Sequence, residues 1–171
     1  STLRILCTDE NLMEYLVRDG VVKALVILCR YKSINVQLAC AQSINALLSF
    51  PKRAKTLIHL GAVGVLVYLC NNKMADYIGE WCAYSLLLLC YADEATCSVK
   101  VLVEGVLPSV LKLCDERATD LTRSFCATAL AVITHNPLID SSSSIPILVY
   151  MLNQAGEEQI KTDCASALYN L

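Results

Sequence analysis

A glycine followed nine residues later by a cysteine occurs three times in this chain of 171 residues. The copies are "VRDGVVKALVILC", "IHLGAVGVLVYLC" and "LVEGVLPSVLKLC", and their glycines, Gly20, Gly61 and Gly105, lie 41 and then 44 residues apart. Self-similarity at this period is typical of arrays in which each unit packs on its neighbours. The chain is therefore expected to fold as a stack of small repeats.

A second cysteine follows each motif after 11 or 12 residues, in "LACAQSINALL", "EWCAYSLLLLC" and "SFCATALAVIT", and "TDCASALYNL" supplies a fourth copy. Cys40, Cys82, Cys126 and Cys164 thus share one position, flanked by Ala or Ser and by large aliphatic residues at helical spacing. A small side chain is required where helices pack closely. We predict that these cysteines are buried packing residues and not disulfide partners.

Glycines, prolines and polar linkers divide each unit into three helices. The first helix ends at the glycine, whose freedom to take positive φ suits a helix stop, and the second begins at once. Pro108 and Pro146 fall in the first turn of the second helix, where a missing N–H costs little. A polar linker and a longer third helix follow. The predicted repeats cover residues 9–50, 51–93, 94–136 and 137–171, and residues 1–8 are expected to end a preceding third helix.

The fourth unit is degenerate, because "NPLIDSSSS" offers little first helix and Ser143 stands where the glycine should be. The chain opens inside one third helix and closes at the end of another. No capping repeat is visible at either end, although such arrays normally need one for solubility. We therefore expect an excerpt of a longer array, with possible self-association through its uncapped ends.

The pattern resembles the armadillo (ARM) repeat, whose family consensus runs roughly "G-x-[IV]-P-x-L-V-x-L-L" and later "V-Q-x-x-A-x-x-A-L-x-N-L". The matching segments are 20–26, 105–111, 36–44 and 164–171. The resemblance implies an all-α, right-handed α-solenoid of about four armadillo-like three-helix repeats in a single array over residues 1–171. HEAT repeats are the main competitor, and the junction of glycine with an apolar run argues against them.

Composition excludes several classes of ligand. With 14 basic and 16 acidic residues, the chain lacks the surplus positive charge needed to release counterions from a phosphate backbone, so nucleic acid is not expected as a ligand. The apolar runs are shorter than the roughly 20 residues that cross a bilayer, so no membrane insertion is expected. No secretory leader is visible, which favours an intracellular, cytoplasmic location.

The sequence offers no basis for catalysis. His59 and His135 lie in different repeats and neither has a metal-ligand spacing. No nucleophile elbow, phosphate-binding loop or dinucleotide fingerprint occurs. We expect no cofactor, no metal site and no enzymatic activity.

The segment "YIGEWCAYSLLLLCY", residues 77–91, has two apolar faces when wound into a helix. The expected core positions are Ile78, Cys82, Ser85, Leu86 and Leu89. A second stripe recurs at steps of four, three, four and three residues, and so shares another face. It comprises Tyr77, Trp81, Tyr84, Leu88 and Tyr91.

By resemblance, this second stripe faces the concave groove that third helices line in the armadillo family. Equivalent positions in the other units are Gln42, Thr128, Val132, Ser166 and Asn170, and Glu80 is the nearest acid. Importin-α-like members carry a Trp and, four residues later, an Asn at two of these places. Only Asn170 keeps the amide, so binding of nuclear signals in that manner is not expected.

Two hypotheses follow. In the first, the chain is a non-catalytic scaffold or adaptor whose groove binds a protein partner, either an amphipathic helix laid side-on or an extended peptide. In the second, it is a structural segment of a larger solenoid or homo-oligomer, and the aromatic stripe is buried by its own assembly.

Overall fold

A computed structural model describes residues 15–18, 20–73, 75–92, 97–115 and 117–171. Within these ranges every regular element is a helix. The all-α class predicted from the repeat is therefore confirmed. The predicted end of a preceding helix, residues 1–8, and most of the first helix of the first repeat lie outside the described residues.

Second and third helices alternate along the chain, with shorter helical segments between them. The second helices are α3 (Val21–Leu28), α6 (Ala62–Asn72), α9 (Leu107–Leu113) and α11 (Ile145–Gln154). The third helices are α4 (Ile34–Leu48), α7 (Asp76–Cys90), α10 (Asp120–Thr134) and α12 (Glu158–Asn170). The shorter segments are η1 (Pro51–Arg53) with α5 (Ala54–His59), α8 (Val99–Val101) with the π-helical η2 (Leu102–Val106), and η3 (Ser142–Ser144).

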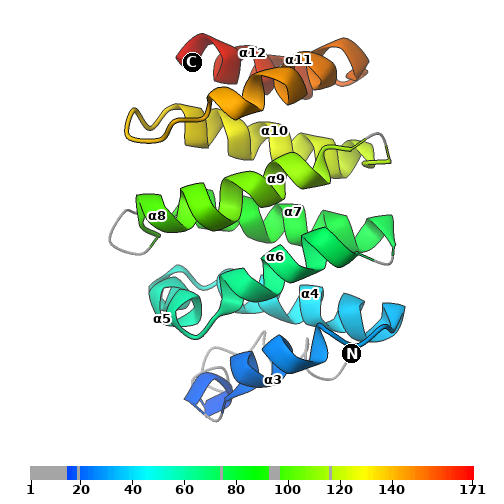
Figure 1. Ribbon diagram of the computed structural model, residues 1–171, viewed down its shortest axis with the longest axis vertical. Coiled ribbons are helices and arrows are strands. Elements are labelled where there is room, and N and C mark those ends of the chain that lie inside the picture. The colour runs from blue at the N-terminus through cyan, green and yellow to red at the C-terminus, as the bar shows by residue number, and fades with distance from the viewer. Residues whose placement is uncertain (1–14, 19, 74, 93–96, 116) are drawn as a thin grey trace.

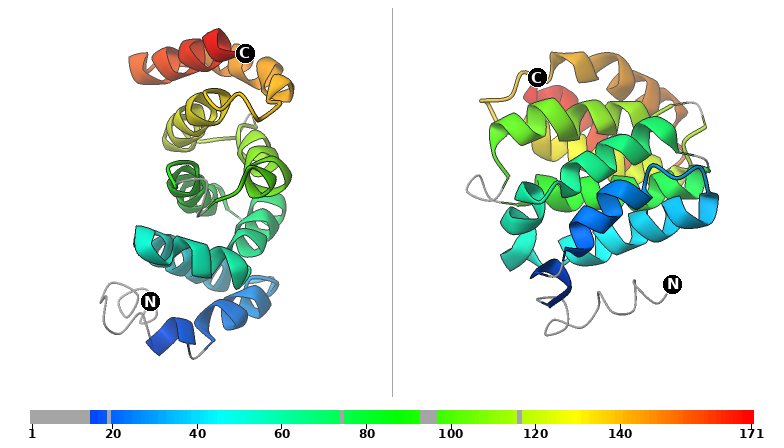
Figure 2. Two further views of the ribbon diagram at one scale, coloured as in Figure 1. Left: turned by 90° about the vertical axis from the view of Figure 1, so that its left-hand side faces the viewer. Right: turned by 60° about the horizontal axis from the view of Figure 1, so that its bottom comes forward.

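The helices form two layers that stack along the long axis of the molecule (Figure 1). Third helices pack on third helices, in the order α4, α7, α10, α12, and among the second helices α3 packs on α6 and α6 on α9. All third helices run in one direction across the stack, from right to left in Figure 1. Seen from the side, the two layers bow into a crescent with the third helices on its inner face (Figure 2, left).

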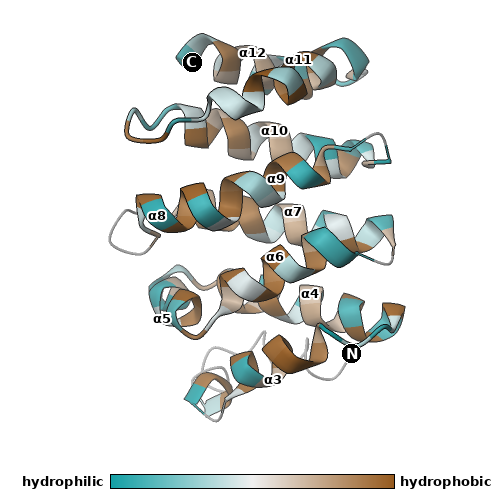
Figure 3. Cartoon of the chain, in the orientation of Figure 1, coloured by the Kyte–Doolittle hydropathy of each residue, from teal (hydrophilic) through white to brown (hydrophobic). Residues whose placement is uncertain are grey.

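Small buried side chains set the distance between neighbouring third helices. The four repeated cysteines are buried, as predicted, and so are Ala41, Ala83 and Ala127, each next to one of them. All five core positions predicted in α7 are also buried. Hydrophobic residues run along the helices of both layers, whereas hydrophilic residues gather on connecting loops and helix ends (Figure 3). The core is therefore continuous from repeat to repeat.

Two of the three repeated glycines end a helix as expected. Gly20 and Gly61 have φ of 91° and 100°, values that L side chains rarely adopt, and α3 and α6 begin immediately after them. The prediction is wrong for Gly105, which lies within the continuous helical run formed by α8, η2 and α9. A widened turn replaces the break, and the Ser109 hydroxyl donates to the Gly105 carbonyl at 2.7 Å.

Gly105 is instead required by packing against the preceding repeat. A Cβ placed on it would lie 2.8 Å from Cγ1 of Val63 on α6, closer than real Cβ contacts. The absence of a side chain thus lets η2 approach α6. The same residue type serves a turn in two repeats and a close helix contact in the third.

The fourth repeat has a single 3-10 turn, η3, in place of a first helix. The Ser144 hydroxyl donates to the Ser141 carbonyl at 2.6 Å. The backbone N–H of Ser142 donates to the Asp140 carboxylate at 3.1 Å, and hydrogen bonding from Ser142 lowers the pKa of this carboxyl. These local bonds hold a short connection where the second repeat has the six-residue helix α5.

The contact at Gly105 gives a test of the fold. Gly105→Ala is expected to lower the free energy of unfolding by about 1–3 kcal/mol, because the new methyl group overlaps Val63. Urea denaturation would measure the change, and Val63→Ala in the same chain should restore part of it. Gly156→Ala is the matched control, since its Cβ would meet nothing within 4 Å. Equal losses in the two glycine variants would contradict the packing role.

Candidate functional site

One stripe of α7 remains open on the inner face of the crescent. Tyr77, Tyr84 and Tyr91 are 44%, 37% and 62% exposed, and Trp81 and Leu88 are half-buried. Residues between them on the helix, including Ile78, Cys82 and Leu86, are buried against the adjacent helices. The two apolar faces of this helix therefore differ: one is core and the other is accessible.

The open stripe forms a pocket with the neighbouring helix α10. The pocket is lined by Glu80, Trp81, Tyr84, Leu121 and Phe125 and has a volume of about 230 Å³. The rings of Tyr84 and Phe125 stack, with centroids 5.0 Å apart and planes at 26°. Offset stacking at this separation is favourable beyond the area it buries. We call these five residues the aromatic pocket.

Glu80 has a structural partner at the edge of the aromatic pocket. The Thr119 hydroxyl donates to Oε1 of Glu80 at 2.8 Å and accepts from the backbone N–H of Thr122 at 3.2 Å. Thr119 is the N-cap of α10, so it satisfies one of the N–H groups that a helix start leaves free. Glu80 thereby links α7 to the start of α10 and brings a carboxylate to the pocket wall.

A second hollow continues the stripe toward the C-terminal end of α7. Leu88 and Tyr91 line it together with Leu48 of α4 and with Pro51 and Ala54, and its volume is about 310 Å³. The hollow lies between the first and second complete repeats. The aromatic pocket lies one repeat further along, so the stripe of α7 contributes to both.

The other predicted groove residues are polar except for Val132, and two of them form hydrogen bonds within the chain. The Thr128 hydroxyl donates to Oδ2 of Asp163 at 2.6 Å, and the Asn170 amide donates to the Thr134 hydroxyl at 3.4 Å. Gln42 and Val132 are half-buried and Ser166 is exposed. At the positions equivalent to the stripe, aromatic side chains therefore occur on α7 and α10, whereas α4 and α12 carry the amides and hydroxyl of Gln42, Ser166 and Asn170.

Sequence reasoning missed Leu121 and Phe125, although the repeat register points to them. Cys126 follows its counterpart Cys82 by 44 residues. The same offset takes Tyr77 to Leu121 and Trp81 to Phe125. The predicted groove positions on α10 are the equivalents of Tyr84 and Leu88 alone, and they leave out the apolar positions one and two turns earlier on that helix.

Hydrogen bonds between side chains of neighbouring third helices fix the inner layer. Nδ2 of Asn45 on α4 donates to the Ser85 hydroxyl on α7 at 3.2 Å, and Ser85 donates to the Trp81 carbonyl at 2.8 Å. Each junction between third helices thus carries a polar contact. Asn45 and Ser85 join α4 to α7, Glu80 and Thr119 join α7 to the start of α10, and Thr128 and Asp163 join α10 to α12. Binding surfaces on packed helices supported in this way are held more rigidly than loops.

The cysteines that the structure describes are free thiols in the core. Burial raises the pKa of Cys40 to about 12, and of Cys97 and Cys164 to about 11. Contact with Cys70 and burial raise the pKa of the Cys82 thiol, and Cys114 acts on Cys126 in the same way. Protonated thiols are poor nucleophiles and poor metal ligands.

In the described part of the chain, no group of three or more His, Cys, Asp or Glu side chains is placed to hold a metal ion. No helix in that part is long and apolar enough to cross a bilayer by itself. Pro51–His59 and Ala62–Asn72, bent by 77°, meet the length and composition requirement only as a pair.

Solved structures of designed armadillo repeat proteins share this fold. One aligns with a TM-score of 0.78 at 19% identity, over 99% of this chain and 72% of that chain. A computationally designed armadillo repeat protein for modular peptide recognition aligns with a TM-score of 0.77 at 19% identity, with the same coverage. A third, in complex with peptide (KR)4, aligns with a TM-score of 0.75 at 19% identity, again over 99% and 72%.

No protein-family model and no curated protein sequence matches the chain. The structural matches span nearly the whole chain at low identity. The fold is therefore that of an armadillo repeat solenoid, as the repeat pattern predicted.

The buried thiols give a test of the core. Cys7 lies outside the described residues, so the test uses a Cys7→Ser variant. At pH 8, a reagent that reacts with thiols should label the other nine cysteines only after the protein unfolds. The pKa of a thiol is near 9 in the unfolded chain, whereas burial raises the pKa of Cys40 to about 12 in the folded chain. The buried, protonated thiols therefore stabilise the fold fully below pH 9, and this stabilisation falls as the pH rises above 9. Fast labelling of any native thiol would contradict the assignment.

Proposed function

We propose that the chain is a non-catalytic scaffold that binds a segment of a partner protein on the inner face of its third helices. The observation that carries the proposal is the aromatic stripe of α7, which stays accessible while the core face of that helix is buried. Tyrosine and tryptophan supply most of the binding energy at many protein interfaces. Designed proteins with this fold are named for peptide recognition, which supports the same use of the fold.

The dimensions of the stripe favour a helical partner. Trp81 and Tyr91 are ten residues apart, which is roughly 15 Å along a helix. A partner helix of two to three turns would place apolar anchors at i, i+3, i+4 and i+7 against this length. The polar side chains of α4 and α12, with Gln42 and Asn170 among them, would suit the backbone of an extended peptide instead. The central aromatic surface leads us to favour the helix.

A structural role is the second candidate, because the outer flank of α12 is also open. Ala165 is exposed, whereas its counterparts Ala41, Ala83 and Ala127 are buried by the following repeat. Tyr169 on the same helix is 91% exposed. A second copy stacked on this flank would continue the solenoid, and the aromatic stripe could then be covered within the assembly.

Alanine substitution at the stripe tests the first proposal. A peptide selected from a random display library on the native chain should bind Trp81→Ala and Tyr84→Ala about 5- to 150-fold more weakly, a loss of about 1–3 kcal/mol. Fluorescence anisotropy of the labelled peptide would measure the dissociation constants. Tyr31→Ala, which removes an exposed aromatic residue of the first repeat outside the stripe, should leave them unchanged.

Circular dichroism and thermal unfolding of each variant would show that the fold is intact. Unchanged peptide affinity in both stripe variants would overturn the proposal. Sedimentation of the native chain over a range of concentrations would test the structural role, which requires association that Tyr169→Asp abolishes.

A further inference from the structure

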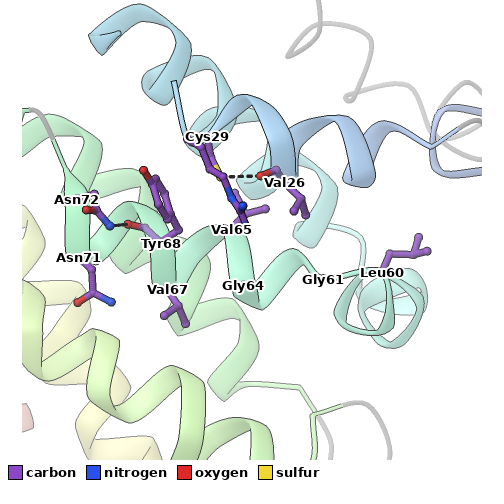
Figure 4. A pocket seen from close by; sticks show the side chains of 11 residues that line it. Val26, Cys29, Leu60, Gly61, Gly64, Val65, Val67, Tyr68, Asn71 and Asn72 are labelled. Carbon is purple, nitrogen blue, oxygen red and sulfur yellow. Dashed lines mark hydrogen bonds between the residues drawn. The ribbon is translucent and has the colours of Figure 1, made fainter. Parts of the chain in front are cut away.

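An open pocket lies on the other layer, between the second helices α3 and α6 (Figure 4). Its volume is about 510 Å³, within the range of ligand-binding clefts. Val26 and Arg30 come from the α3 side, and Gly64, Val65, Tyr68 and Asn71 from α6. In Figure 4 the lining runs along α6 from Leu60 and Gly61 at one end to Asn71 and Asn72 at the other. We call this cleft the outer groove.

Gly64 holds the outer groove open without serving the fold. It lies inside α6, where glycine is less favourable for a helix than alanine. It does not have positive φ, and a Cβ built on it would meet nothing within 4 Å. At Gly105, by contrast, the close contact with Val63 leaves no room for a side chain. Neither backbone conformation nor packing therefore explains Gly64, whereas access to the cleft does.

The charges of the chain are divided along its length. Residues 1–19 contain two Lys and Arg and four Asp and Glu, residues 20–75 contain seven Lys and Arg and no Asp or Glu, and residues 76–171 contain five Lys and Arg and twelve Asp and Glu. The outer groove lies entirely within the basic part. A surface with one sign of charge attracts a partner of the other sign and speeds its association.

The rim of the outer groove combines positive charge with free hydrogen-bonding groups. Val26 on α3 and Arg30, two residues beyond the last residue of that helix, line the groove, and the exposed Lys23 precedes Val26 by three residues on α3. Arg30 is exposed and forms no ion pair with any residue that the structure describes, and the exposed Asn71 amide has no hydrogen-bond partner among the same residues. The floor between them is apolar, with Val65 and Val26.

We propose that the outer groove binds an acidic, amphipathic segment of a partner protein. The apolar side chains of this partner segment lie over Gly64 and Val65, and the carboxylates of the segment face Arg30 and Lys23. This site is separate from the aromatic stripe, which lies on the inner layer. A recessed cleft between two helices suits side chains of a peptide better than the plane of a bilayer, because a membrane surface contacts protruding residues first.

The test uses a defined probe. A fluorescein-labelled peptide of Glu and Leu, about 12 residues long, forms a helix of roughly 18 Å that matches the length of α6. The native chain should bind this peptide, with affinity falling as salt rises, and should bind a version with Gln in place of Glu at least about tenfold more weakly. Arg30→Gln should weaken binding of the acidic peptide about three- to tenfold, and Lys112→Gln on α9 should not.

Gly64→Leu separates binding from stability. Leucine favours the helix and fills the cleft, so the variant should keep or raise the melting temperature while losing at least about tenfold in affinity for the acidic peptide. Trp81→Ala should bind the acidic peptide as the native chain does, which makes this result independent of the proposed inner-face function.

Three outcomes would overturn the inference. The Gln peptide could bind as well as the Glu peptide, or Gly64→Leu could retain full affinity. Alternatively, vesicles containing phosphatidylserine could bind the chain while the acidic peptide does not, which would assign the basic surface to a membrane.

Discussion

The close approach of neighbouring third helices is the contact on which the rest of this structure depends. It requires a small side chain at the same two places in each repeat: a cysteine and the alanine beside it, as at Cys82 and Ala83. Interiors are packed as densely as organic crystals, so a larger side chain there would separate the repeats. Thiol and methyl groups fill this seam without adding polar atoms that need partners. Cysteine is abundant here for its size and apolar character.

This packing determines where sequence can vary. Each internal third helix is covered by the second helix of its own repeat and by third helices on both sides, so a single stripe of it reaches the inner face. The repeats share their buried positions and differ on that stripe, with aromatic residues in α7 and polar ones in α4 and α12. The fold therefore fixes the position of the surface, and the individual repeat fixes its chemistry.

Much of the fold could be predicted because the repeat reports burial directly. The cysteine register located the core of α7, and the spacing of Tyr77, Trp81 and Tyr84 located its open stripe. The pattern did not distinguish the role of Gly105 from that of Gly61. Gly105 is required by its close contact with Val63, which lies 42 residues earlier in the sequence and in another repeat. Nor does periodicity within one helix reveal a neighbour across the seam, which is how Phe125 joins the aromatic pocket. Contacts between repeats were what the sequence left undetermined.

The common direction of the third helices gives the inner face an electrical polarity. The peptide dipoles of each helix sum to about half a positive charge at its N-terminus and half a negative charge at its C-terminus. Because α4, α7, α10 and α12 run in one direction, the N-termini form one edge of the groove and the C-termini the other (Figure 1). A helix lying along α7 is favoured when it runs antiparallel to this array. The backbone alone thus biases a bound helix toward one of its two orientations, whichever apolar side chains it presents.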